Sequence, residues 1–463
     1  MRPDLGPLLQ PRSIAVIGAS TQALKVGGMP IRLLRENGYS GAIYPVHRTA
    51  ATIQDLPAYP SLEAIGQPVD LAIIAVPVEG CEEAMQQLAR AGTRAAIVFT
   101  SGFAETGEGG LAQQQAMADT ARQYGIALLG PNCLGAMNLH ERMFATFSPV
   151  VLGGAPAPGK VALVSQSGAF GGYAFSLARE AGLGLGYWIT TGNEAGIQAA
   201  DAIHWLAEDA RTEVILVYLE GARDEGRLRA ALGAARDAGK PVAIVKVGYT
   251  LVGARAARLH TGSDTGNDAR YQAIFDEFNV HRAYTIGELF RLGHVLANRK
   301  RRPGPPLGRK LRLGVLSISG GVGIMMADRA QQHGFDMPPL PPEPATRLLA
   351  RIPFAATANP VDVTGQVFSQ PEVLVAALAD VARCGAYDYI AAFMAGAGNA
   401  PGVWTALQPC VAELTAEAGA ATMVFSGLFN AQQKSWLEAQ GCLVYREPAE
   451  AVDAVATLAR AAP

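Results

Sequence analysis

Two glycine-rich turns of the same design contain the residue types best suited to chemistry in this sequence. Each follows an aliphatic run and reads Ser-x-Ser-Gly, from Ser165 to Gly168 and from Ser317 to Gly320. Because the next residues favour a helix, each turn would gather unpaired backbone N–H groups at the positive end of a helix dipole. That arrangement binds phosphate. The candidate phosphate-binding residues are Ser167, Gly168, Ser319, Gly320 and Gly321.

A histidine lies between the two turns in the sequence. His260 is followed by Thr261, Gly262 and Gly266, and these small residues predict a mobile loop in place of a helix face. An imidazole with an ordinary pKa of about 6.5 is mostly neutral and nucleophilic near neutral pH. A lone histidine is more often structural than catalytic, but this one, with phosphate sites on either side, indicates phosphoryl transfer through a phosphohistidine.

A carboxylate beside the ring would hold its tautomer and raise its pKa. Glu220, at the end of a strand predicted over 214–219, is the first candidate for this role. Glu194, which follows Thr191-Gly192-Asn193, is the second. The alternative for each is an ordinary solvated glutamate.

The sequence offers no means of holding a nucleoside triphosphate. It has no G-x-x-x-x-G-K-[ST] motif and no cluster suited to magnesium, so we expect no metal site in this chain. A phosphohistidine without a nucleotide site requires a partner protein.

A further ligand crevice is predicted near the N-terminus. A strand over 13–17 ends in Gly18-Ala19-Ser20, the arrangement of a nucleotide-type ligand over a strand end. The glycines of a dinucleotide fingerprint are missing, and the second strand is followed by His47 and Arg48 where NAD binding needs a carboxylate. A ligand with an extra ribose phosphate fits better than NAD, and a plain strand-to-helix turn is the alternative.

The elements that must position these residues follow one pattern. Short aliphatic runs alternate with helix-forming stretches almost throughout, which predicts an α/β protein of parallel sheets covered by helices. We place doubly wound domains at 1–145, 146–298 and 311–463. The basic, proline-rich residues between them, 299–310, form a predicted linker. The shared turns of the second and third domains suggest two copies of a similar fold.

Composition excludes several classes of protein. A net charge of −2 argues against a nucleic-acid-binding surface, and no apolar run is long enough for a membrane helix. Hydrophobic residues are 49% and charged residues 17%, which is typical of a globular protein. The five cysteines show no C-x-x-C spacing. We therefore expect a soluble, cytoplasmic protein with reduced cysteines.

The chain resembles the α subunit of nucleoside-diphosphate-forming (ADP-forming) acyl-CoA synthetases, relatives of succinyl-CoA synthetase. The resemblance covers essentially the whole chain and is specific because many motifs occur in the same order. They lie at residues 16–20, 25–28, 43–46, 101–105, 130–135, 165–168, 191–194, 218–221, 260–262, 319–321 and 359–362.

This resemblance implies a CoA-binding Rossmann-like domain followed by two flavodoxin-like domains. It implies an acid–CoA ligase subunit that interconverts acyl-CoA, phosphate and NDP with a small carboxylic acid, CoA and NTP, through an acyl phosphate and phosphorylated His260. Glu220 would stabilise the phosphohistidine. ADP or ATP and Mg²⁺ would bind an ATP-grasp β subunit in an α₂β₂ assembly. The residues implied in CoA contacts are Gly18, Ala19, Ser20, Val76, Pro77, Thr100, Ser101 and Asn132.

The sequence departs from the family at two places. Leu259, Ser263 and Asp264 replace the serine and alanine pattern common around the active histidine, and residues 47–49 replace a usual Asn-Pro-Lys. A non-catalytic protein that binds CoA or acyl-CoA as a regulator is the alternative function, and the presence of both His260 and Glu220 favours the ligase. The acid, and the choice between ADP and GDP, do not follow from the sequence.

Overall fold

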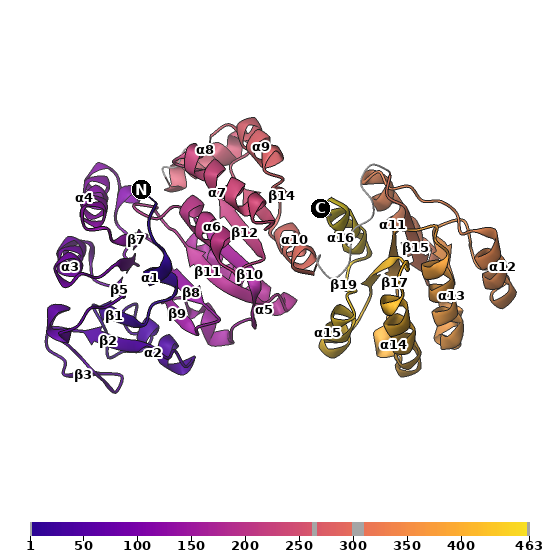
Figure 1. The fold of residues 1–463 in the computed structure, drawn as a ribbon, viewed down its shortest axis with the longest axis horizontal. Helices are drawn as coiled ribbons and strands as arrows, with labels where there is room; N and C mark the ends of the chain where they lie inside the picture. The colour runs from indigo at the N-terminus through magenta and orange to yellow at the C-terminus, as the bar shows by residue number, and fades with distance from the viewer. Residues whose placement is uncertain (1, 262–265, 299–309, 461–463) are drawn as a thin grey trace. The chain divides into compact units, whose positions relative to one another are not determined.

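Three large β-sheets, each with helices on its faces, organise the described part of the chain (Figure 1). The structure is a computed structural model that describes residues 2–261, 266–298 and 310–460, without the side chains of residues 258–261 and 366. The chain divides into two compact units, Met1–Gly293 with the first two sheets and His294–Pro463 with the third.

The first sheet is parallel, and apart from the edge strand Ala42–Val46 its strands are short aliphatic runs buried almost completely on both faces, as helix-covered sheets require. Its strand order is β2-β1-β5-β6-β7. The strands are β1 Ser13–Ile17, β2 Ala42–Val46, β5 Leu71–Ile74, β6 Ala95–Val98 and β7 Ala127–Leu129, with a small hairpin of β3 Thr52–Ile53 and β4 Leu56–Pro57. The helices are α1 Gly6–Leu9, α2 Met29–Glu36, α3 Val78–Ala91 and α4 Glu108–Tyr124.

The second sheet has five parallel strands and an antiparallel extension, in the order β14-β13-β12-β10-β11-β8-β9. Its strands are β8 Gly135–Asn138, β9 Met143–Thr146, β10 Pro158–Ser165, β11 Leu185–Thr190, β12 Val214–Leu219, β13 Val242–Lys246 and β14 His281–Ala283. Its helices are α5 Gly168–Ala181, α6 Ala199–Glu208, α7 Glu225–Asp237, α8 Leu251–Thr261, α9 Asp268–Glu277 and α10 Ile286–Asn298.

Strands β8 and β9 were not predicted, because they are four residues long and Thr146 is their only β-branched residue. β8 precedes residue 145 and yet pairs with β11. The predicted domain limits stay a prediction, and residues 299–309 of the predicted linker lie outside the described residues.

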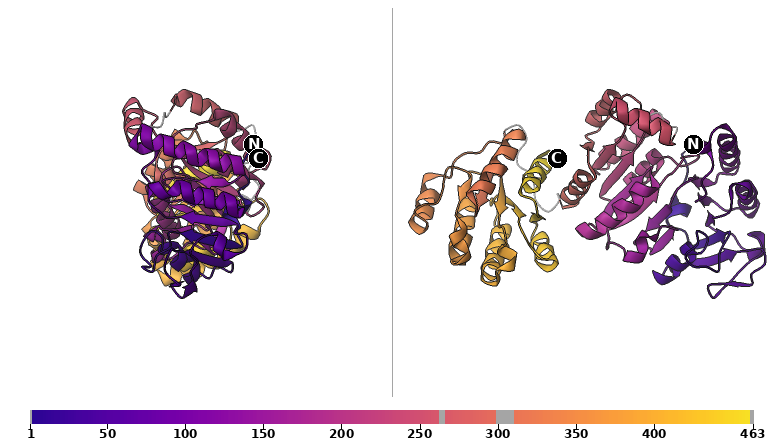
Figure 2. Two further views of the ribbon diagram at one scale, coloured as in Figure 1. Left: turned by 90° about the vertical axis from the view of Figure 1, so that its left-hand side faces the viewer. Right: turned by 180° about the vertical axis from the view of Figure 1, so that it is seen from behind.

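The third sheet is parallel throughout, in the order β16-β15-β17-β18-β19. Helices flank the sheets in the views of Figure 2 as well. The strands are β15 Leu313–Ser317, β16 Val361–Asp362, β17 Tyr389–Phe393, β18 Thr422–Ser426 and β19 Leu443–Tyr445. The helices are α11 Gly320–Gln332, α12 Pro342–Arg351, α13 Pro371–Arg383, α14 Pro401–Ala416, α15 Ala431–Ala439 and α16 Pro448–Arg460.

All three sheets share one strand order. Apart from the small additions, the first strand of each series lies between the second and the third, which gives the order 2-1-3-4-5 of flavodoxin-like folds. The predicted fold class, a Rossmann-like domain followed by two flavodoxin-like domains, is confirmed. In such sheets ligands bind beyond the carboxyl end of the first strand, where neighbouring connections turn to opposite faces and leave a crevice.

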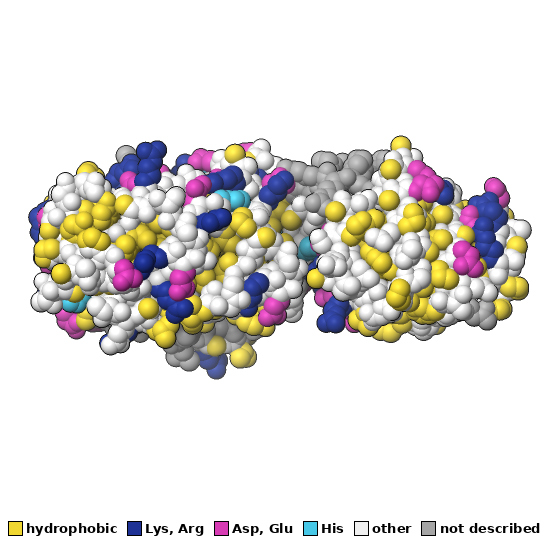
Figure 3. Space-filling model, turned by 90° about the horizontal axis from the view of Figure 1, so that it is seen from below, with side chains coloured by type: hydrophobic (Ala, Val, Ile, Leu, Met, Phe, Trp, Pro, Cys, Tyr) yellow, Lys and Arg dark blue, Asp and Glu magenta, His cyan; other side chains and the backbone are white. Residues whose placement is uncertain are grey.

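The surface agrees with the balanced composition. In the face shown in Figure 3, basic and acidic side chains are interspersed, in keeping with the net charge of −2. Across the described ranges, every helix is too short or too polar to span a lipid bilayer. The five cysteines form no disulfide; Cys81, Cys133 and Cys442 are buried and the other two are half-buried.

The two sheets of unit 1 share one hydrophobic core. It joins Ile14 and Ile97 of the first sheet to Ile189 and Ile215 of the second. Gly192, just after β11, allows the backbone of the second sheet's loop to approach Pro131 closely. It has φ +59°, and a Cβ there would lie 2.4 Å from the carbonyl oxygen of Pro131.

Gly192→Ala tests this contact, with Gly182→Ala as the matched control. Gly182 has a similar φ of +69° and open space around it. We expect the control to lower the free energy of unfolding by about 1 kcal/mol, for the left-handed backbone alone. Gly192→Ala should cost about 2–4 kcal/mol because overpacking is added. Urea denaturation followed by circular dichroism measures both; equal losses would contradict the tight approach.

Candidate functional site

The first crevice lies at the carboxyl ends of β1 and β5, the switch point of the first sheet. Gly18 follows β1 with φ +82°, and a Cβ there would lie 2.5 Å from the carbonyl oxygen of Ala75 and 2.9 Å from Cγ1 of Val76. Only glycine fits such an approach. Ala19 is buried, and its N–H donates to the carbonyl oxygen of Val46 at 3.2 Å. The turn is therefore fixed by the two neighbouring strands.

Hydrogen bonds join this turn to the next strand ends. The Thr100 hydroxyl donates to the carbonyl oxygen of Val76 at 2.6 Å, and the Asn132 N–H donates to the carbonyl oxygen of Thr100 at 2.9 Å. The structure thus brings together Gly18, Val76, Thr100 and Asn132. Of the other predicted CoA contacts, Ser101 is exposed, Ser20 accepts from the Gln22 N–H at 3.1 Å, and Pro77 precedes α3. Their contacts with CoA stay predictions.

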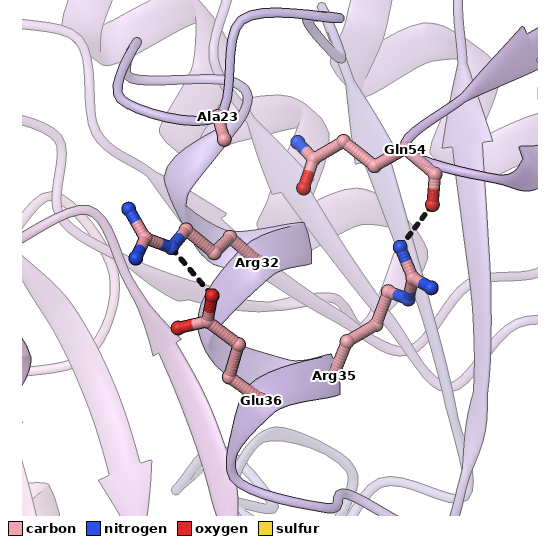
Figure 4. Close-up of a pocket in the computed structure, with 5 residues that line it drawn as sticks. All are labelled: Ala23, Arg32, Arg35, Glu36 and Gln54. Atoms are coloured by element: carbon pink, nitrogen blue, oxygen red, sulfur yellow. Dashed lines mark hydrogen bonds and ion pairs between the residues drawn. The ribbon is translucent and has the colours of Figure 1, made fainter.

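Sequence reasoning missed a pocket of about 430 Å³ beside this turn, lined by Ala23, Arg32, Arg35, Glu36 and Gln54 (Figure 4). The Gln54 amide donates to the carbonyl oxygens of Ser20 and Gly28, at 3.3 and 2.9 Å, and so fixes both ends of the loop after β1. Arg32 is paired with Glu36 at 2.7 Å, and Arg35 donates to the backbone of Gln54. Gln54 comes from the β3–β4 hairpin, which no motif marked.

The second crevice lies at the carboxyl ends of β10 and β12, the switch point of the second sheet. The Ser165 hydroxyl donates to the carbonyl oxygen of Ser167 at 2.6 Å, and the Ser167 side chain caps α5 by accepting from the Phe170 N–H at 3.3 Å. Gly168 is the first residue of α5. The predicted phosphate-binding turn is thus the N-terminus of a helix of 14 residues, where a dipole of positive sign meets the crevice.

Gln166 binds this turn to the end of β12. Its side-chain oxygen accepts from the N–H groups of Glu220 and Gly221, at 2.5 and 3.2 Å, and its amide nitrogen donates to the Gly221 carbonyl at 2.7 Å. Glu220 is half-buried at this crevice. The sequence marked Gln166 as part of a motif, but it gave no signal of this role, because the partners are backbone groups of a distant strand.

Glu194 lies in the loop after β11, the strand that pairs with β10, and is only 5% exposed. Its Oε1 accepts from the Thr191 hydroxyl at 2.9 Å and from the Ala199 N–H at 2.8 Å. Burial raises the pKa of the Glu194 carboxyl, and these hydrogen bonds oppose the rise. For Glu194 the alternative of a solvated glutamate is wrong.

Asn193, the residue before it, reaches the first sheet. Its N–H donates to the carbonyl oxygen of Pro131 at 2.9 Å, and its amide oxygen accepts from Asn132 at 3.2 Å. Its amide nitrogen donates to Glu105 and Gln114, at 2.5 and 3.0 Å. Asn193 therefore contacts the predicted CoA site through Asn132, while the next side chain, Glu194, bonds to Thr191 and Ala199 of the second domain.

A buried lysine was also missed. Lys246, at the end of β13, is 2% exposed; its Nζ donates to the Val247 carbonyl at 2.6 Å and lies 4.7 Å from the centre of the Tyr271 ring. The Tyr271 hydroxyl accepts from the Ala222 N–H at 2.8 Å, which ties this cluster to the chain after Glu220. The signal in the sequence that could have revealed this residue is a lysine at the end of an aliphatic run.

The predicted loop at His260 is wrong for His260 itself. Helix α8 runs from Leu251 to Thr261 and includes it. Residues 254–259, Ala-Arg-Ala-Ala-Arg-Leu, are strong helix formers and carry the helix up to the glycine at 262. The imidazole, and Ser263 and Asp264, lie outside the described residues, so the meeting of His260 with Glu220 stays a prediction.

The second Ser-x-Ser-Gly turn repeats the first within unit 2. The Ser317 hydroxyl donates to the carbonyl oxygen of Ser319 at 2.6 Å, as Ser165 does to Ser167. The copies differ in that Ser319 makes no side-chain cap, and a Cβ on Gly320 would lie 3.0 Å from Oδ2 of Asp362. Gly321 faces open space. Phosphate contacts by Ser319, Gly320 and Gly321 stay predictions.

Known proteins resemble this chain in sequence and in domain content. Residues 12–138 match a CoA binding domain, and residues 158–296 match a succinyl-CoA ligase like flavodoxin domain. The α subunit of acetate–CoA ligase [ADP-forming] I from Pyrococcus furiosus is 35% identical, over 78% of this chain and 77% of that protein. Acetate–CoA ligase [ADP-forming] I of Archaeoglobus fulgidus is 36% identical, over 78% of this chain and 51% of that protein.

A solved structure is similar over nearly the whole chain. It is the Ca. Korarchaeum cryptofilum dinucleotide forming acetyl-coenzyme A synthetase 1 in complex with phosphate and ADP. It has a TM-score of 0.85 and 30% sequence identity, and the match covers 99% of this chain and 97% of that one.

Gly18→Ala tests the first crevice. A methyl group at Gly18 must displace the Ala75 carbonyl and Val76, so we expect the Kd for CoA to rise at least about tenfold, or 1.4 kcal/mol. Gly66→Ala is the control, because Gly66 has φ +72° but open space around it. Titration calorimetry with CoA measures both, and an unchanged Kd for Gly18→Ala would place the CoA site elsewhere.

Glu194→Gln tests the raised pKa of Glu194. A carboxyl whose pKa is higher in the folded state takes up a proton on folding, so its ionisation opposes folding. Relative to Glu194→Gln, the wild-type protein should therefore keep its stability below the ordinary pKa of a glutamate and lose stability as pH rises through the raised value. Urea unfolding at a series of pH values measures the difference, and a difference that grows in the opposite direction would contradict the burial argument.

Proposed function

Since the chain belongs to the family of ADP-forming acetate–CoA ligases, we propose that it is the subunit that carries CoA and the phosphorylated histidine in an acid–CoA ligase. The CoA-binding domain and the ligase class follow from the family. The residue roles, the phosphohistidine and the partner are proposals. A cytoplasmic location stays a prediction from the sequence.

The proposed reaction has three reversible steps. A phosphate oxygen attacks the thioester of acyl-CoA, which releases CoA and forms an acyl phosphate. A ring nitrogen of His260 then takes the phosphoryl group and releases the carboxylate of a small acid. Finally the terminal oxygen of ADP takes the phosphoryl group from the ring and leaves a free imidazole.

One observation carries the proposal: Gln166 holds the Glu220–Gly221 backbone against the N-terminal turn of α5. The helix end supplies N–H groups and positive potential for the phosphoryl group at Ser167 and Gly168. The carboxylate of Glu220 can then accept from the second ring nitrogen of His260 and stabilise the charge of the phosphohistidine.

A second subunit completes the enzyme. The relative from Pyrococcus furiosus is named a subunit alpha, which implies a partner. We propose that the partner is an ATP-grasp β subunit, that it binds ADP or ATP with Mg²⁺, and that the assembly is α₂β₂.

Labelling with ATP carrying ³²P at its terminal phosphate tests the histidine. With the cognate ATP-grasp subunit and Mg²⁺, we expect acid-labile, base-stable label on this chain, none on His260→Asn, and at least about tenfold less on Glu220→Gln because the charge on the ring loses its partner. The control is His204→Asn, since His204 is a half-buried helix residue paired with Glu208 at 3.4 Å. Label that persists on His260→Asn would contradict the proposed phosphorylation of His260.

A further inference from the structure

We propose that Tyr271 is a positioning residue for the phosphate crevice: its hydroxyl holds the backbone two residues after Glu220, and its ring supports the backbone of Gly266, which follows helix α8. The geometric part rests on contacts within unit 1. The catalytic consequence rests on the proposed function. Neither the ring nor the hydroxyl takes part in the three proposed steps, so Tyr271 would act only through the groups that it holds.

Three consecutive backbone N–H groups hold the chain that carries Glu220. The side-chain oxygen of Gln166 accepts from the N–H groups of Glu220 and Gly221, at 2.5 and 3.2 Å. The next N–H group, that of Ala222, donates to the Tyr271 hydroxyl oxygen at 2.8 Å. Gln166 comes from the loop between β10 and α5, whereas Tyr271 belongs to α9. The loop after β12 is therefore bound both to the phosphate-binding turn and to a helix that follows α8.

Burial fixes the position of the Tyr271 ring. The residue is 8% exposed, lies in the hydrophobic core of unit 1 and contacts Phe275 of the same helix, with 6.1 Å between the ring centres. The Lys246 ammonium lies 4.7 Å from the centre of the Tyr271 ring, within the range of cation–π attraction. Lys246 is itself held, because its Nζ donates to the Val247 carbonyl at 2.6 Å. The hydroxyl oxygen therefore has a defined place, at which it accepts from the Ala222 N–H.

The same ring lies against the backbone that follows the helix of His260. Helix α8 ends at Thr261, and Gly266 precedes α9 with φ +68°. A Cβ at Gly266 would lie 2.9 Å from Cε2 of Tyr271 and 3.7 Å from its hydroxyl oxygen. Only glycine allows this approach without displacing the ring. Tyr271 thus contacts two chain segments that the proposed mechanism uses, the one after Glu220 and the one after α8.

Tyr271→Phe isolates the role of the hydroxyl. The variant keeps the ring, and with it the contacts with Lys246 and Gly266, but the half-buried Ala222 loses the acceptor of its N–H group. A donor without a partner costs free energy away from water, so the loop should move until that N–H group is hydrated. Glu220, two residues earlier in the loop, would move with it. The carboxylate would then lose the alignment that transfer of a phosphoryl group to an imidazole needs.

Gly266→Ala tests the contact of the ring. The added methyl group meets Cε2 of Tyr271, so the ring or the backbone must move. Gly239→Ala is the matched control, because Gly239 has φ +66° and open space around a Cβ. A displaced ring carries its hydroxyl with it, so Gly266→Ala should speed exchange of the Ala222 N–H as Tyr271→Phe does, and Gly239→Ala should not. Unchanged exchange in Gly266→Ala would contradict the support of this backbone by the ring.

Tyr39→Phe is the matched control for the hydroxyl. The Tyr39 hydroxyl donates to the Pro11 carbonyl oxygen at 2.7 Å, so this variant also loses a hydrogen bond between a tyrosine and the backbone, but in the first domain. Hydrogen–deuterium exchange of overlapping peptides that span residues 220–222 measures the geometry without any reaction. Formation of phosphohistidine from ATP labelled at its terminal phosphate, with the cognate ATP-grasp subunit and Mg²⁺, measures the consequence. Titration calorimetry gives the Kd for CoA, and urea denaturation gives the stability of each variant.

We expect Tyr271→Phe to speed exchange over residues 220–222 about fivefold or more, as the loss of one hydrogen bond implies. It should slow phosphohistidine formation about tenfold or more through misalignment, with the Kd for CoA unchanged. Tyr39→Phe should lose a comparable amount of stability to urea and change neither the exchange over residues 220–222 nor the rate of labelling. A purely structural role of Tyr271 would lower stability in the same way and leave the rate of labelling unchanged.

Unchanged exchange in Tyr271→Phe, or faster exchange with an unchanged rate of labelling, overturns the inference. If the wild-type chain takes no label, the proposed function fails, and the exchange measurement then decides whether Tyr271 holds the loop after Glu220.

Discussion

The position of the first strand between the second and the third is the constraint on which both sites of unit 1 depend. In this order the connections on either side of the first strand leave toward opposite faces of the sheet, so no helix covers the end of that strand. The end of that strand is therefore where a ligand can approach the sheet. In the first sheet the opening lies at Gly18 and Val76, and in the second it lies at Ser167 and Glu220. The strand order therefore determines where each ligand site lies, and the side chains determine its chemistry.

Side-chain amides then set the shape of each opening. Gln54 holds both ends of the loop after β1, and Gln166 joins the loop after β10 to the end of β12. An amide suits this task because it satisfies backbone donors and acceptors together without burying a charge. The buried Glu194 carboxyl is the exception, and the free-energy cost of burying it is offset by hydrogen bonds from the Thr191 hydroxyl and the Ala199 N–H. A buried carboxyl with a raised pKa at such a place is consistent with a functional constraint.

Residues 192–194 join the two sheets of unit 1. Gly192 permits the close approach to Pro131, Asn193 bonds to Asn132 and Gln114, and Glu194 accepts from the Ala199 N–H at the start of α6. Neighbouring residues of one short loop therefore join the first sheet to the second. The third sheet repeats the serine turn of the second, but Asp362 lies near its helix start, so the two copies do not offer a phosphate the same surroundings.

The sequence by itself determined the α/β class, the aliphatic strands and the two serine turns, because these are local: hydrophobic period, glycine and helix propensity act over a few residues. It also placed Glu220 and Gly18 at strand ends. Only the tertiary structure decided that Gln166 binds the chain after β12, that Glu194 is buried, that Gln54 holds the first loop and that β8 and β9 extend the second sheet. Those contacts join residues far apart in the chain, and their partners are mostly backbone groups, which have the same chemistry at nearly every position. At His260 the local signal was misjudged, since the helix formers before it outweighed the glycines after it.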